Sequence, residues 1–131
     1  MRRCIIASII LTTGCGFQYD VLDTQSVVED KLIAETARFA GMKSVQVIGR
    51  ITDSLTQAQK LQEPVGFYLS GVAWYYRPAV EKYVSLEPEY NHETATNVAS
   101  HEVCHAVTGP QHDVKHWDCM ASIATPTYPH P

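Results

Sequence analysis

The segment His101-Glu102-Val103-Cys104-His105 lies inside a predicted helix and carries the strongest chemical signal in the chain. Asn91 is the expected N-cap of this helix, which runs to about Thr108. Gly109-Pro110 is expected to end it, because glycine adopts a left-handed cap and proline cannot continue a helix. Four residues make just over one turn, so the imidazoles of His101 and His105 are expected on the same face.

Two neutral imidazoles in this arrangement can bind one Zn²⁺ at about 2.0–2.1 Å each. Glu102 follows one position further round the helix, where its carboxylate can reach a metal-bound water without ligating the metal. Zn²⁺ lowers the pKa of such a water towards about 7, so Glu102 can act as the general base. It can then pass the proton to a leaving amine. The motif therefore predicts a zinc-dependent hydrolytic centre.

A catalytic zinc site needs a third protein ligand besides the two histidines of the motif. His112 directly follows the Gly-Pro turn and is the predicted third ligand, because the chain can fold back over the helix there. His116, one turn later in a second predicted helix, is the alternative. The histidine that does not bind the metal could orient a ligand or donate to the transition state. Asp113 and Asp118 are either partners of a ligand imidazole or solvated surface charges.

The segments around the motif resemble those of SprT-like zinc peptidases, a family of minimal zincins. The resemblance covers roughly residues 65–120: a predicted hairpin containing Gly71–Tyr76 precedes the motif, and a third histidine, His112, follows after a short connection. His116-Trp117 stands where the family has an aromatic pair. The resemblance implies an α+β fold with a small antiparallel sheet packed on the motif helix and an N-terminal helix. A peptide substrate would add to the edge of that sheet as an extra strand.

The remaining elements of a zincin-like domain are predicted over residues 26–124. Ser26 and Glu29 match a capping box, and the helix that they begin is expected to end at Gly41. Residues 45–48 are predicted to form a strand, and residues 53–63 are either helix or loop. A hairpin is expected over 65–69 and 72–76, and a half-buried strand over 81–86.

The composition fits one globular domain. The chain has 131 residues, of which 45% are hydrophobic, and its formal net charge is −4. This length suits a single domain with its own core. The acidic balance offers no basic face for nucleic acid, so no nucleic-acid partner is expected. No run of about 20 apolar residues is present, as a standard membrane-spanning helix would require.

The N-terminus has the pattern of a bacterial lipoprotein signal peptide over residues 1–14. Two arginines precede a short apolar run, and Leu11-Thr12-Thr13-Gly14-Cys15 resembles a lipobox in which Cys15 receives the lipid. The alternative is a buried N-terminal strand or helix with an incidental cysteine. Residues 15–25 would then be a tether, and the proline-spaced residues 125–131 a flexible tail. The chain is therefore expected to be exported and anchored to the membrane of the cell envelope through the lipid.

Cys104 lies in the motif, and Cys119 follows 15 residues later. Outside the cytosol, where disulfides can persist, these two cysteines form either a disulfide or two buried free thiols. Together the patterns predict an exported zinc peptidase with Glu102 as general base, Zn²⁺ as cofactor and a peptide or protein as substrate. The alternative is a non-catalytic zinc-binding envelope lipoprotein with a structural or interaction role. A third interpretation is an envelope lipoprotein in which the motif is fortuitous.

Overall fold

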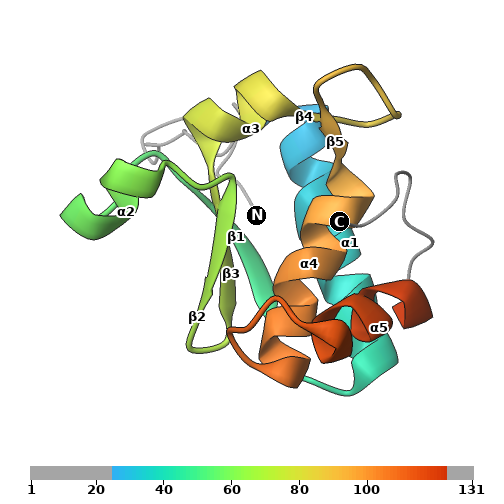
Figure 1. The fold of residues 1–131 in the computed structure, drawn as a ribbon. Helices are drawn as coiled ribbons and strands as arrows, with labels where there is room; N and C mark the ends of the chain where they lie inside the picture. Colours follow the sequence, from blue (N-terminus) through green and yellow to red (C-terminus); the bar gives the residue numbers. More distant parts are fainter. Residues whose placement is uncertain (1–24, 124–131) are drawn as a thin grey trace, which may run out of the picture.

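The computed structural model describes residues 25–123, which form an α+β domain (Figure 1). The predicted signal peptide, Cys15, nearly all of the tether and the tail lie outside the described residues. None of the helices within residues 25–123 is long and apolar enough to cross a membrane. The helices are α1 (Val27–Lys43), α2 (Gln57–Gln62), α3 (Arg77–Tyr83), α4 (Ala95–Thr108) and α5 (Val114–Ile123). The strands are β1 (Ile48–Thr52), β2 (Gly66–Leu69), β3 (Val72–Tyr76), β4 (Val84–Ser85) and β5 (Glu93–Thr94).

The main sheet is mixed, so the expected antiparallel sheet is wrong in this respect. Its strand order is β1-β3-β2, with β2 antiparallel to β3 and β1 parallel to β3. After β1, residues 53–65 lead to β2, which does not pair with β1. The next strand, β3, lies between β1 and β2 and pairs with both. The chain reverses twice between β1 and β3, so these neighbours run in the same direction. The predicted hairpin is confirmed, and Ser70 and Gly71 both have positive φ, as a tight hairpin turn requires.

Helices α1 and α4 pack side by side against one face of this sheet (Figure 1). Ala73 and Tyr75 of β3 point towards the helices and are buried, whereas their neighbours along the strand are only half-buried. This alternation follows from the period of two in a strand. Tyr75 joins Leu32 of α1 and Val98 of α4 in one core cluster. A second core cluster forms where α5 packs on α4, and it includes Val103 and Met120.

The N-terminal helix begins as predicted but ends later than Gly41. The Ser26 hydroxyl accepts the Glu29 N–H, and the Glu29 carboxylate accepts the Ser26 N–H, which confirms the capping box. The helix ends at Ser44, whose backbone is left-handed, and the Val45 N–H bonds to the Ala40 carbonyl. This is a Schellman cap, which non-glycine residues can also form. Residues 45–47 make the connection, so β1 starts at Ile48, three residues later than predicted.

The half-buried strand predicted over residues 81–86 is wrong for most of its length, because helix α3 extends to Tyr83. Proline fits the first turn of a helix, and Pro78 lies there in α3. The next two residues, Ala79 and Val80, are buried in the core, whereas the segment 81–83 is exposed. Only Val84 and Ser85 form a strand, which pairs with β5. The alternating polar and apolar residues therefore belong to the end of a helix and to the two extended residues that follow it.

Two further boundaries were settled by the structure. Thr94, not Asn91, caps α4, because its hydroxyl accepts the Asn97 N–H at 3.2 Å. Asn91 instead has a left-handed backbone in the turn before β5. Residues 57–62, which the sequence left as helix or loop, form α2 with a Thr56–Gln59 capping box.

Candidate metal centre

Helix α4 places His101 and His105 with their rings together. Their Nε2 atoms are 3.1 Å apart, as expected for two side chains separated by one turn on the same face. Gly109 ends the helix with a positive φ, and the chain folds back so that His112 meets both rings. The His112 Nε2 lies 3.2 Å from that of His101 and 3.1 Å from that of His105. Three Nε2 atoms therefore form a nearly equilateral triangle.

This triangle fits a divalent cation. In a tetrahedral zinc site with Zn–N distances of about 2.0–2.1 Å, two ligand nitrogens lie about 3.3–3.4 Å apart. The His105 Nδ1 lies 2.9 Å from the Gly109 carbonyl oxygen, which can only accept, so the Nδ1 carries the proton and the Nε2 presents a lone pair. Lone pairs that converge at this distance repel one another unless a cation lies between them. The donor set could therefore hold a metal ion.

Burial favours the neutral form of His105. The pKa of His105 is lowered, first by burial and then by the charge of His112, while the bond to the Gly109 carbonyl acts in the opposite direction. Metal binding requires a neutral imidazole, because a protonated ring has no free lone pair. A lowered pKa therefore keeps the lone pair of this imidazole available at neutral pH.

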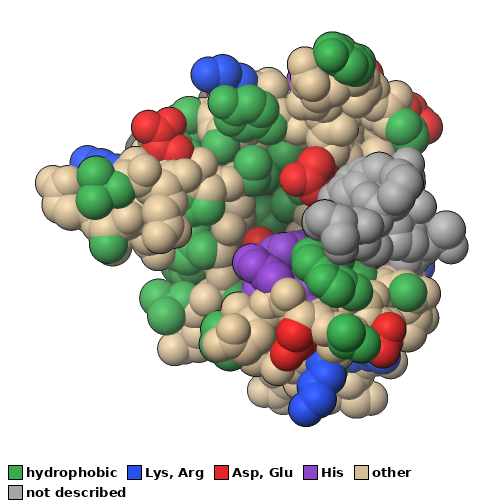
Figure 2. Space-filling view, viewed as in Figure 1, with side chains coloured by type: hydrophobic (Ala, Val, Ile, Leu, Met, Phe, Trp, Pro, Cys, Tyr) green, Lys and Arg blue, Asp and Glu red, His purple; other side chains and the backbone are tan. Residues whose placement is uncertain are grey.

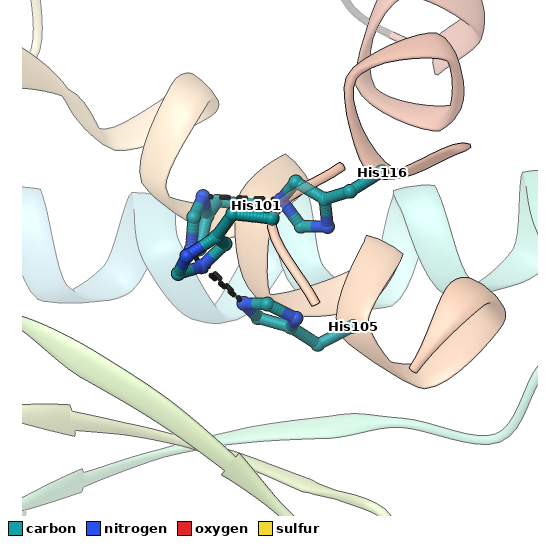
Figure 3. Close-up of side chains that lie close together, drawn as sticks. His101, His105 and His116 are labelled. Carbon is teal, nitrogen blue, oxygen red and sulfur yellow. Dashed lines mark hydrogen bonds between the residues drawn. The ribbon is translucent and has the colours of Figure 1, made fainter. Parts of the chain in front are cut away.

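His116 joins the cluster from α5, where its ring lies against those of both His101 and His105, with centroids 4.6 and 4.4 Å away. Its Nε2 lies 3.3 Å from the Nδ1 of His101, not from the Nε2 that belongs to the triangle. Figure 3 shows the three labelled rings gathered together, with contacts from the two nitrogens of His101 to His105 and His116. One nitrogen from each of the four histidines can be chosen so that all lie within 4.8 Å of one another. The structure thus brings both candidate third ligands to the site, but only His112 completes the triangle.

A disulfide holds α5 against α4. Cys104 and Cys119 are bonded across 15 residues of sequence, and both are buried. Asp113 accepts the His116 N–H at 3.2 Å and so caps the first turn of α5, rather than contacting a ligand imidazole. Asp118 is exposed. The segment closed by the disulfide contains His105, His112 and His116, so its ends are fixed close to the site.

Glu102 is buried beneath β2, with 4% of its surface exposed. A Cβ added at Gly66 would lie 3.3 Å from the Glu102 Oε2, so glycine at this position leaves room for the carboxylate. The Oε1 has no hydrogen-bond partner among residues 25–123. Burial, with a smaller effect from the negative charge of Glu93, raises the pKa of Glu102 to about 8. Burying a carboxyl group whose oxygen has no hydrogen-bond partner lowers the stability of the fold. Buried acids with a strongly shifted pKa are found most often at functional sites.

Two residues that shape the environment of Glu102, Gly66 and Glu93, could not be identified from the sequence. Gly66 and Glu93 are 36 and 9 residues away from Glu102 in the chain, and their effects depend on how β2 and β5 pack around α4. Tyr75 also lies near this carboxylate, whose charge adds to burial in raising the pKa of the phenol. The Tyr75 hydroxyl is 2.6 Å from that of Thr36 in the core. Tyr75 is therefore a packing residue.

The histidines are accessible from one side of the molecule. His112 is exposed, and His101 and His105 are half-buried. Figure 2 shows histidine side chains at the centre of this face, in a hollow bordered by hydrophobic side chains. Comparison of the chain with family models, curated proteins and solved structures found no match. Fold and site together define an α+β protein with four histidines that could hold a metal ion.

Proposed function

We propose that the protein is a zinc-dependent peptidase in which His101, His105 and His112 bind the metal and Glu102 is the general base. The observation that carries this proposal is the triangle of three Nε2 atoms, 3.1–3.2 Å apart, together with a buried glutamate on the helix that bears His101 and His105. The Oε1 of this glutamate has no hydrogen-bond partner among residues 25–123. Three histidines leave a fourth tetrahedral position for water or substrate, as in catalytic rather than structural zinc sites.

The chain's own groups suit hydrolysis of an amide bond. A bound Zn²⁺ would polarise the substrate carbonyl and increase the acidity of water. The Glu102 carboxylate would take a proton from the attacking water and deliver it to the amide nitrogen, so that the C–N bond breaks and the amine leaves neutral. A pKa raised by burial lets Glu102 hold the proton between these two steps. The nearby cation would lower that pKa again, which brings it closer to neutrality.

The position of β2 supports an extended peptide as the substrate. This strand lies at the edge of the main sheet, beyond β3, and packs on α4 through Gly66 and Glu102. A peptide that adds to the free edge of β2 by backbone hydrogen bonds would pass next to the general base. The recognition would then depend mainly on the peptide backbone and less on a deep side-chain pocket.

The disulfide supports the expected location of the protein. Disulfides persist mainly in exported proteins, because the cytosol keeps thiols reduced. The bond between Cys104 and Cys119 therefore agrees with the signal-peptide pattern of residues 1–14. We propose that the domain works in the cell envelope, anchored through a lipid on Cys15, with peptides or envelope proteins as substrates.

The non-catalytic alternative requires a different coordination. A structural zinc site uses four protein ligands, and His116 is the residue that could supply the fourth. Its Nε2 lies 3.3 Å from the Nδ1 of His101, an atom that is not part of the triangle. The four ligand atoms spread over as much as 4.8 Å, whereas the three Nε2 atoms lie 3.1–3.2 Å apart, so the geometry favours three ligands and an open position.

The test compares zinc-loaded wild type with Glu102→Gln on a library of fluorogenic peptides. We expect the variant to retain about one equivalent of zinc and to lose about 10²–10⁴-fold in cleavage rate, because an amide cannot accept the proton. Glu87→Gln, which neutralises an exposed carboxylate, is the control and should cleave normally. The proposal is wrong if Glu102→Gln retains zinc and cleaves peptides as fast as wild type.

A further inference from the structure

We propose that His116 is a positioning residue that orients His101 for metal binding through an N–H···N hydrogen bond. This inference rests on the proposed metal centre. The side chain of His116 is fully buried, with 0% of its surface exposed, and its Nε2 lies 3.3 Å from the Nδ1 of His101. The two rings meet edge to face, with centroids 4.6 Å apart and planes inclined at 74° (Figure 3).

Metal binding determines the direction of this hydrogen bond. If the Nε2 of His101 binds a cation, the Nδ1 must carry the ring's proton, because a neutral imidazole has one proton. The only role left for the His116 Nε2 is then that of acceptor. His116 thus does for His101 what the Gly109 carbonyl does for His105, whose Nδ1 lies 2.9 Å from that oxygen. Both interactions fix the tautomer and the ring plane of a ligand.

The third ligand is supported in a different way. His112 is exposed, and its ring stacks on Trp117 with the planes inclined at 18° and the centroids 6.0 Å apart. His116 and Trp117 are adjacent residues in the first half of α5, so this helix supports two of the three ligands. Its own position is fixed by the Cys104–Cys119 disulfide and by the Asp113 cap. The site is therefore preorganised by α5 before the metal binds.

The choice of histidine has a chemical consequence. Ligand histidines usually donate to a carboxylate, a carbonyl or water, and a carboxylate makes the ligand more basic. The imidazole of His116 accepts the same proton without adding a negative charge to the buried site. A neutral acceptor leaves more positive charge on the metal, which favours a more acidic water in the open position.

The test measures zinc affinity by competition with a chromophoric chelator in His116→Phe, His116→Gln and wild type. Phe fills the space but cannot accept a hydrogen bond, and we expect its affinity to be about 10–100-fold weaker. Gln can place an amide oxygen near the position of the Nε2, so it should recover most of the loss. His92→Gln, which removes a histidine away from the cluster, should bind zinc as wild type does. X-ray absorption should count three imidazole ligands in wild type and in His116→Phe.

A second measurement needs no variant and decides the question if His116→Phe does not fold. In zinc-loaded wild type labelled with ¹⁵N-histidine, NMR should detect a coupling across the hydrogen bond between the His101 Nδ1 and the His116 Nε2. The proposal is overturned if His116→Phe binds zinc as tightly as wild type, if the imidazole count falls from four to three on substitution, or if no such coupling exists. Failure of wild type to bind zinc would instead refute the metal centre itself, and this inference with it.

Discussion

Replacing Glu102 by glutamine should change how the stability of the metal-free protein depends on pH. The pKa of Glu102 is raised from 4.5 to about 8 in the folded state, chiefly by burial. Between these pH values the unfolded chain releases the proton while the folded chain retains it. The contribution of Glu102 to the free energy of unfolding is therefore fully present below pH 4.5 and is lost as the pH rises through 8.

The size of the effect follows from the shift. One pKa unit corresponds to about 1.4 kcal/mol, so the shift from 4.5 to about 8 lowers the free energy of unfolding at pH 8 by at most about 5 kcal/mol. Water entry and local relaxation reduce the cost of a buried charge in real proteins. We therefore expect Glu102→Gln to gain about 2–4 kcal/mol relative to wild type between pH 5 and pH 8, since the amide cannot ionise.

The assay is urea unfolding of both proteins at pH 5 and pH 8, in the presence of a chelator and with the disulfide intact. The exposed Glu87→Gln variant controls for the loss of a carboxylate and should leave the pH dependence unchanged. Zinc should remove most of the difference between wild type and Glu102→Gln, because a cation near the carboxylate stabilises its charged form. An identical pH dependence in metal-free wild type and Glu102→Gln would refute the assignment of a raised pKa to this residue.

Three other perturbations test the surroundings of the site. Glu93→Gln removes a negative charge that raises the pKa of Glu102, so this pKa should fall. In the same unfolding assay the pH-dependent loss of metal-free stability should then be smaller and should end at a lower pH; an unchanged pH dependence would contradict this. Reduction of Cys104–Cys119 releases a closed loop with a sequence separation of 15. We expect a loss of about 3 kcal/mol in calorimetry and weaker zinc binding, whereas unchanged zinc affinity would show that the disulfide does not preorganise the ligands. Gly66→Ala places a Cβ 3.0 Å from Tyr75 and 3.3 Å from the Glu102 carboxylate, and should cost about 1–3 kcal/mol in thermal unfolding and reduce cleavage. Its control, Gly41→Ala, meets nothing within 4 Å in α1 and should stabilise by about 0.5–1 kcal/mol.

Local patterns predicted the elements that depend on neighbours in sequence. The capping box at Ser26 and the hairpin around Ser70-Gly71 both formed as expected, because caps and tight turns are decided within a few residues. The alternation in residues 81–86 was misleading, since a short pattern fits the end of a helix as well as a strand. The parallel pairing of β1 with β3 depends on where a distant hairpin inserts, and no local signal encodes that.

The candidate site divides in the same way. One helical turn separates His101 from His105, so the sequence alone determined that their rings would lie together. His112 and His116 are also four residues apart and equally suitable as ligands by residue type. Tertiary structure places them differently: the turn at Gly109 brings the His112 Nε2 to 3.2 Å from the Nε2 of His101, whereas the packing of α5 on α4 brings the His116 Nε2 to the Nδ1 of His101. The burial of Glu102 under β2 was likewise decided only by tertiary structure, since burial depends on a strand that lies far away in the chain.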